Sequence, residues 1–209
     1  HPNAMRVLAA NGRADTLRAR GWPYSLRETF DQRGGWLATR DYRPLYAAGR
    51  LSAGSLVHRA HPHQTLHDPL PPGSVRLGVT IRELQASAEG VRVVTDDGQG
   101  LEGELLVGAD GIRSTVRARF FGLNEPVYLG YRSHRFVVEN RDGLEAFTEF
   151  YGHGRRIGLV PISRERLYVW TTFNSPRASR EWALESPAAF RHLFSEFTDP
   201  RVVHAFEQL

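Results

Sequence analysis

Asp110 is the side chain of this 209-residue sequence whose setting best suits ligand chemistry, because it follows a short apolar run and stands between two nearby glycines. The run at residues 105–107 is typical of a strand buried on both faces, and Gly108 and Gly111 permit a tight turn. Open α/β sheets hold their ligands at the carboxyl ends of strands. We therefore expect Asp110 at the carboxyl edge of a sheet, where its carboxylate can accept hydrogen bonds from ligand hydroxyl groups.

The residues after this turn predict a helix. Ser114 can cap its first turn, and Val116 and Phe120 fall at i, i+4 spacing on one side of it. A plainer interpretation is that Asp110 and Ser114 only shape a strand-to-helix turn, since Asp, Gly and Ser are ordinary turn residues. The residue types and spacing of so short a motif favour a ligand-binding Asp110 and a purely turn-forming Asp110 about equally.

The ten-residue run at 108–117, GADGIRSTVR, resembles the second nucleotide-binding motif of single-component FAD-dependent monooxygenases related to p-hydroxybenzoate hydroxylase. In that family the aspartate lies near the ribityl chain and pyrophosphate of FAD and is also implicated in NAD(P)H binding. The resemblance therefore implies FAD as the cofactor, NAD(P)H as the reductant, and Asp110 as a cofactor-binding residue. It implies the same role for the neighbouring residues Gly108, Gly111 and Arg113.

A second segment, at residues 57–66, is similar to the family's strand-to-helix segment in which an arginine approaches the flavin. Family members carry leucines three and seven residues after that arginine. Here Arg59 and Leu66 fit this spacing, whereas Pro62 stands in place of the first leucine. The resemblance implies that Arg59 contacts the cofactor, and the alternative is a solvated surface arginine.

Two parts of the family pattern are not found in the sequence. Family members begin with a βαβ unit whose GxGxxG turn opens the helix that holds the FAD pyrophosphate, and they carry a later Gly-Asp segment that closes on the flavin. We therefore expect this chain to be an internal piece of a longer monooxygenase. The implied fold class is α/β with α+β character. Residues 1–125 would form a partial FAD/NAD(P)-binding Rossmann-like domain, and 126–209 an inserted, mainly antiparallel substrate-binding sheet with trailing helices.

Composition excludes several other classes. The chain has no cysteine, which rules out disulfides and cysteine metal sites, and no apolar run reaches the roughly 18 residues of a membrane span. All 27 basic residues are arginine, but they are scattered among 23 acidic residues with a net charge of +4, so no nucleic-acid partner is expected. His58, His61 and His63 lack the spacing and carboxylates of a metal site. No secretory signal pattern opens the chain, and the cytoplasm is the expected compartment.

The rest of the pattern predicts elements that would position these residues. Helices are expected at 3–10, 13–20 and after Arg59, a strand at 75–77, and a β-meander at 80–86, 91–95 and 101–105. Residues 22–54 show no sustained period and predict loop and short strands. Strands at 127–139, 146–151, 156–161 and 166–173 predict a separate sheet. Two helices begun by Ser186-Pro187 and Asp199-Pro200 follow it.

These expectations favour part of an FAD-dependent monooxygenase that hydroxylates an aromatic or related small organic substrate with NAD(P)H and O₂. No catalytic side chain can be named, since the cofactor carries out the oxygen chemistry in this family. Two alternatives stay open: a non-catalytic α/β module that keeps the fold without binding FAD, and an arginine-rich nucleic-acid-binding protein.

Overall fold

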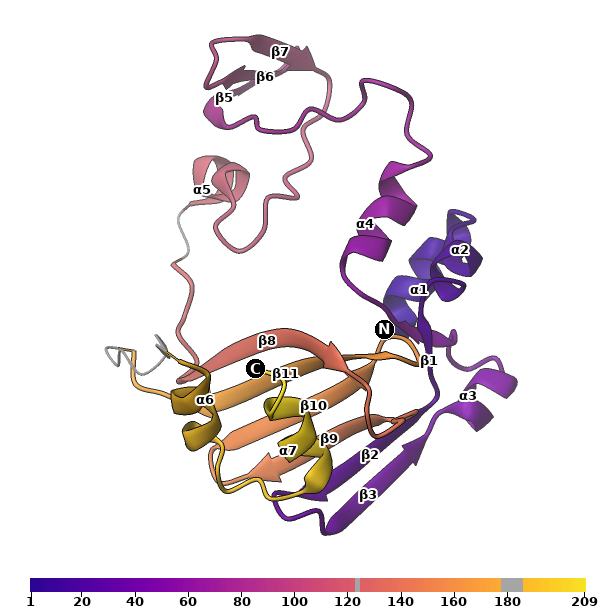
Figure 1. Ribbon diagram of the computed structural model, residues 1–209. Coiled ribbons are helices and arrows are strands. Elements are labelled where there is room, and N and C mark those ends of the chain that lie inside the picture. Colours follow the sequence, from indigo (N-terminus) through magenta and orange to yellow (C-terminus); the bar gives the residue numbers. More distant parts are fainter. Residues whose placement is uncertain (123–124, 178–185) are drawn as a thin grey trace. The chain divides into compact units, whose positions relative to one another are not determined.

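The computed structural model describes residues 1–122, 125–177 and 186–209, and the chain divides into two compact units. The large unit consists of His1–Pro69 and Gly130–Leu209, and the small unit of Leu70–Leu129 (Figure 1). The domain boundary expected at residue 125 stays a prediction about the whole protein. None of the helices in the described ranges is long and apolar enough to cross a membrane.

The large unit is built on a six-stranded sheet in the order β3-β2-β9-β10-β11-β8. The four strands expected in the second half of the chain are confirmed, and they pair antiparallel: β8 (Tyr131–Glu139), β9 (Phe147–Gly152), β10 (Arg155–Pro161) and β11 (Arg166–Asn174). The sheet gains two strands from the first part of the chain, β2 (Leu26–Asp31) and β3 (Trp36–Asp41). β2 runs parallel to β9, with Arg27 paired to Phe147. The predicted α/β class with a mainly antiparallel sheet is therefore confirmed.

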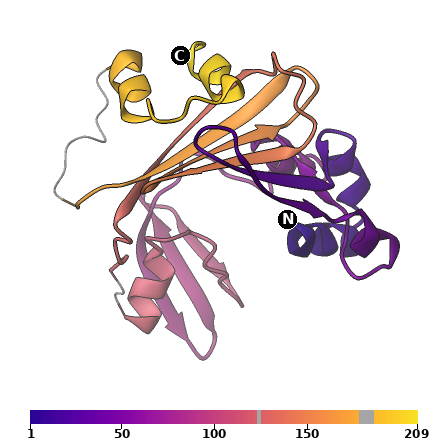
Figure 2. The ribbon, with the colours of Figure 1, turned by 90° about the horizontal axis from the view of Figure 1, so that it is seen from below.

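One face of this sheet is covered by two short helices, α6 (Pro187–Leu193) and α7 (Pro200–Phe206) (Figure 2). Both begin as predicted, because Ser186 Oγ accepts the N–H of Ala189 and the Asp199 carboxylate accepts the N–H of Arg201. Their apolar sides and the strands share one buried core that includes Phe150, Ile157, Leu159, Val169, Phe173, Phe190, Phe194, Val202 and Phe206.

The opposite side of the sheet carries polar and aromatic side chains. Side chains alternate between the two faces of a strand. In β11 the core-facing residues Leu167, Val169, Thr171 and Phe173 are buried, whereas the residues between them are half-buried. We call this side the second face, and register places on it Arg27, Glu149, Tyr151, Arg156, Gly158, Trp170 and Thr172.

The first part of the large unit contains the two expected helices, α1 (Pro2–Ala10) and α2 (Ala14–Arg18), which share a small core of Met5, Ala14 and Leu17. The region at 22–54 is more ordered than the sequence indicated. It contributes β2 and β3 to the sheet, the helix α3 (Arg43–Ala47), and β1 (Trp22–Tyr24), which pairs with β4 (Gly54–Leu56). The helix expected after Arg59 is present as α4 (Ala60–His67).

The small unit contains the predicted β-meander, formed by β5 (Ile81–Ser87), β6 (Gly90–Thr95) and β7 (Gly100–Gly103), followed by the helix α5 (Thr115–Phe121). Gly98, Gly100 and Gly103 match the GxGxxG spacing, a match that the sequence reasoning overlooked. They lie in the turn before β7 and in β7 itself, so this pattern leads into a strand and not into a helix that could hold a pyrophosphate.

Two predicted strands of the small unit are absent. Residues 105–107, expected as a buried strand before Asp110, have no strand partner, and Leu105 and Val107 are 80% and 74% exposed. Residues 75–77 likewise form no strand. A strand needs hydrogen-bonding neighbours, and the three-stranded meander ends at β7 among the described strands. The expected position of Asp110 at the carboxyl end of a sheet strand is therefore wrong for this structure.

Candidate functional site

The turn around Asp110 depends on its two glycines. Gly111 has a φ of +80°, a left-handed conformation that glycine adopts readily. A Cβ on Gly108 would lie 2.7 Å from the Cβ of Val116, so the backbone can pass α5 closely only without a side chain there. The sequence reasoning identified both positions correctly as turn glycines, although the segment before them is not a strand.

Asp110 holds the start of α5. Its Oδ2 accepts the N–H groups of Thr115 and Val116 at 2.6 and 3.2 Å, and Ser114 Oγ accepts the N–H of Arg117 at 2.9 Å. The pKa of Asp110 is lowered, first by a hydrogen bond from Ser114 and then by backbone N–H groups. The turn-forming interpretation is thus part of the answer, and the Asp110 side chain is still exposed to a ligand.

Arg113 follows the same turn and is exposed. Together with Arg117 it lines an open cavity of about 500 Å³ beside the first turn of α5, and Glu125 and Pro126 also line this cavity. The structure therefore brings four of the predicted site residues into one segment of the small unit: Gly108, Asp110, Gly111 and Arg113. The fifth, Arg59, is an exposed side chain of the large unit, where it immediately precedes α4.

The second face of the large sheet carries a buried ion pair that the sequence did not reveal. Glu149 is 4% exposed, and its Oε2 accepts a hydrogen bond from Arg27 Nε at 2.9 Å as well as one from the Tyr151 hydroxyl at 3.2 Å. Burial lowers the pKa of Arg27, but the hydrogen bond and charge of Glu149 outweigh burial and raise it. These three side chains form one connected polar group on β2 and β9.

Arg156 lies next to this group on β10, between two aromatic rings. Its guanidinium carbon is 5.8 Å from the ring centre of Tyr151 and 5.7 Å from that of Trp170, and its Nε donates to Thr172 Oγ1 at 3.4 Å. Such stacking holds a guanidinium flat and leaves its N–H groups directed outward. Among the described residues, no carboxylate forms an ion pair with Arg156.

Gly158 allows this arrangement, because the indole of Trp170 packs directly over its backbone where a Cβ would stand. The alternation in β10 and β11 gave a signal for Arg156, Gly158 and Trp170 as residues on one face. No local pattern could have joined Arg27 to Glu149, which is 122 positions away in the chain.

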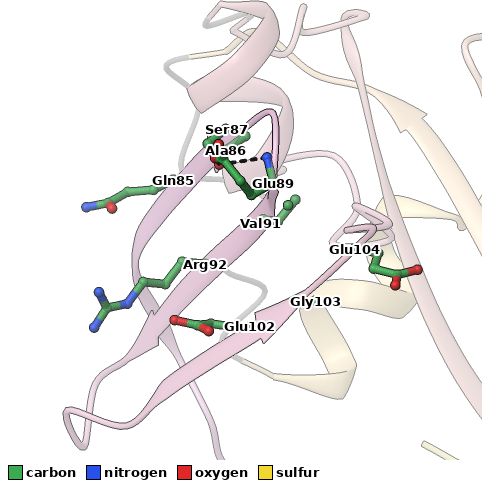
Figure 3. A pocket seen from close by; sticks show the side chains of 10 residues that line it. Gln85, Ala86, Ser87, Glu89, Val91, Arg92, Glu102, Gly103 and Glu104 are labelled. Carbon is green, nitrogen blue, oxygen red and sulfur yellow. Dashed lines mark hydrogen bonds between the residues drawn. The ribbon is translucent and has the colours of Figure 1, made fainter.

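A larger cavity lies elsewhere. It measures about 600 Å³ over the meander, where Gln85, Arg92 and Glu102 line it and Ser87 donates to Glu89 (Figure 3). None of the residues predicted from the sequence lines it. We therefore treat the Asp110 turn of the small unit and the second face of the large unit as two separate candidate sites, and we assign no role to this cavity.

Comparison with known proteins agrees with the motif. No family model matches the chain. The chain is 33% identical over 144 residues to aurachin C monooxygenase/isomerase of Stigmatella aurantiaca, covering 68% of this chain and 37% of that protein. It is 31% identical over 180 residues to 2-heptyl-3-hydroxy-4(1H)-quinolone synthase of Pseudomonas aeruginosa, covering 86% of this chain and 46% of that protein.

A solved structure matches the whole described fold. The crystal structure of Klebsiella pneumoniae HpxO complexed with FAD and uric acid has a TM-score of 0.86 and 26% sequence identity. The match covers 100% of this chain and 54% of that one. The chain thus spans about half the length of the relatives that it matches.

Proposed function

The chain is homologous to about half of an FAD-dependent monooxygenase, and from that premise we propose that the protein containing it hydroxylates an aromatic or related small organic substrate with NAD(P)H and O₂. The observation that carries this proposal is the 29% identity over 81% of the chain to FAD-dependent urate hydroxylase of Klebsiella pneumoniae, joined to the motif at 108–117. The relatives include proteins named as quinolone, urate and aminohydroxybenzoate enzymes, which supports a ring-shaped substrate. A non-catalytic module is not favoured by these matches.

The residues at the Asp110 turn fit an FAD cofactor. Asp110 is an exposed carboxylate on a glycine turn, suited to accept hydrogen bonds from ribityl hydroxyl groups, and Arg113 is an exposed cation suited to phosphate oxygens. In this proposal Gly108 and Gly111 hold the turn, and Arg59 approaches the flavin from the start of α4. Bound FAD, reduced by NAD(P)H, would supply the activated oxygen that the side chains themselves cannot provide.

The second face supplies what the protein itself contributes to a substrate. Arg156 can hold an electron-rich or anionic oxygen of a planar ring, and Tyr151 and Trp170 keep its guanidinium from rotating. These groups orient a ligand, and none of them has to act as a nucleophile or a general acid. The cytoplasmic location and the absence of a nucleic-acid partner stay predictions.

The test is made on the longest protein that contains this chain. We expect the purified protein to bind FAD and to oxidise NAD(P)H faster when a suitable aromatic compound is added, with a product one oxygen atom heavier by mass spectrometry. A panel of hydroxylated benzoates, quinolones and purines covers the ring classes of the relatives. A protein that binds no FAD, or that binds it and hydroxylates no member of a broad panel, would contradict the proposal.

A further inference from the structure

The charges on the second face are unevenly compensated. On the four central strands of the sheet this face holds three arginines, namely Arg27, Arg156 and, at the exposed start of β11, Arg166, and only Arg27 has a carboxylate partner among the described residues. Asp31, at the end of β2, accepts the N–H groups of Arg33 and Gly35. Its carboxylate is therefore occupied by its own turn.

Two further arginines reach this face from the edge strands. Register places Arg40 on β3 opposite Arg27, and Arg135 on β8 opposite Trp170. These two side chains are exposed, as is Arg166 at the start of β11, so water and salt screen their charges. Glu149, in contrast, is buried, and its charge acts on its neighbours with less screening.

Glu149 therefore decides how many effective positive charges the centre of this face presents. With Glu149 ionised, Arg27 is neutralised and Arg156 is the single central cation that can receive a ligand anion. Without that carboxylate, two guanidiniums on neighbouring parts of the face would both attract negative charge. Tyr151 links Glu149 to Arg156, since its hydroxyl donates to Glu149 and its ring lies against Arg156.

We propose that Glu149 is a specificity-determining residue that makes the second face select a planar aromatic ligand with one negative charge over a ligand with two. The proposal deepens the proposed function, because it takes the aromatic ligand to be the substrate of the hydroxylation. Charge complementarity identifies this ligand as a planar aromatic anion. A flat anion can pair with the unpartnered edge of Arg156 and stack on the aromatic side chains beside it.

The test measures binding and needs no flavin, so its outcome is independent of whether the protein hydroxylates anything. The probes are benzoate with one carboxylate, isophthalate with two, and uncharged benzamide, titrated into ¹⁵N-labelled protein while the Nε–H resonance of Arg156 is followed. We expect benzoate to shift this resonance, benzamide to leave it unchanged, and isophthalate to bind no more tightly than benzoate.

In Glu149→Gln the ratio of isophthalate to benzoate affinity should rise about tenfold, the effect of one more positive charge several ångströms from the ligand. The double variant Arg27→Gln/Glu149→Gln removes both charges and should return the ratio to that of the wild type. Arg156→Gln should lose benzoate binding. If Glu149→Gln does not fold, Arg27→Gln gives the opposite test, because an unpaired Glu149 should weaken isophthalate binding more than benzoate binding.

An unchanged ratio in Glu149→Gln, or a double variant that keeps the raised ratio, would overturn the proposal. Wild-type protein that ignores benzoate, or binds it without a shift at Arg156, would overturn it at its first step. A protein that shows the expected ratios but binds no FAD would leave the charge selection intact and contradict the hydroxylase function instead.

Discussion

At the scale of single residues, Asp110 combines a structural contact with a proposed ligand contact. Because its carboxylate accepts the N–H groups of Thr115 and Val116, we expect Asp110→Ala to lower the melting temperature of the chain. In the FAD-binding protein the same change should weaken FAD binding about ten- to a hundredfold, the loss of one hydrogen bond to a charged group. Thermal unfolding and a flavin fluorescence titration measure the two effects.

Ser114→Ala is the matched control, since it removes the hydrogen bonds that Ser114 makes with the Arg117 N–H and with Asp110 but keeps the Asp110 carboxylate. If both variants melt earlier but only Asp110→Ala weakens FAD binding, Asp110 contacts the cofactor. Equal losses of FAD affinity in the two variants would reduce Asp110 to a turn residue.

The pH dependence of the Asp110 contribution has a definite sign. The pKa of this carboxyl is lowered in the folded chain, so its stabilisation is fully present above the ordinary value of 3.8 and is lost as the pH falls through the lower folded pKa. The difference in melting temperature between wild type and Asp110→Ala should therefore be largest near neutral pH and shrink below pH 3.8. A difference that grows on acidification would contradict this assignment.

At the scale of elements, the contact between β10 and β11 depends on Gly158. A Cβ there would occupy the position of the Trp170 indole, so Gly158→Ala should displace that ring and lower stability by about 1–3 kcal/mol, the usual effect of overpacking. The displaced indole should also change tryptophan fluorescence. Gly100→Ala is the control, because a Cβ on this strand glycine comes only to 3.7 Å from Arg92. Similar losses in both variants would show a general effect of removing a glycine from a strand.

Replacing the N-terminal capping residue of α7 by alanine should lower the stability of the chain more than the same replacement at α6. Asp199 is 5% exposed, caps α7 and pairs with Arg201, whose guanidinium carbon lies 4.1 Å from the ring centre of Phe30. Asp199→Ala should cost about 3 kcal/mol, because it removes a cap and leaves a half-buried arginine without its partner. Ser186→Ala removes a cap alone and should cost about 1 kcal/mol. Denaturant unfolding compares the two, and equal losses would contradict a role for the ion pair.

The sequence predicted those elements whose signal is local. Alternation gave the four strands from β8 to β11, and Ser-Pro and Asp-Pro starts gave α6 and α7. It could not give the parallel pairing of β2 with β9, or the contact of Arg27 with Glu149, because both join distant segments. The prediction of a strand at 105–107 was wrong for a related reason. An apolar run shows that a segment needs burial, but not whether a partner strand is beside it.

At the scale of the whole molecule, the described elements hold only part of what a dinucleotide site requires. The one GxGxxG match leads into β7, and α5, which follows the Asp110 turn, has its first free N–H groups already bound by Asp110 and Ser114. Neither feature therefore offers a pyrophosphate the glycine-rich turn and free helix start that it usually binds.

We accordingly expect the 209-residue chain by itself to bind FAD weakly or not at all, while the longest protein that contains it binds FAD stoichiometrically. Equilibrium dialysis of both proteins under the same conditions measures the difference, which should exceed about a hundredfold if the pyrophosphate contacts supply at least two charged hydrogen bonds. Circular dichroism of the short chain is the control for folding. A folded short chain that stays yellow through gel filtration would contradict this expectation and show that the 209 residues suffice to hold the cofactor.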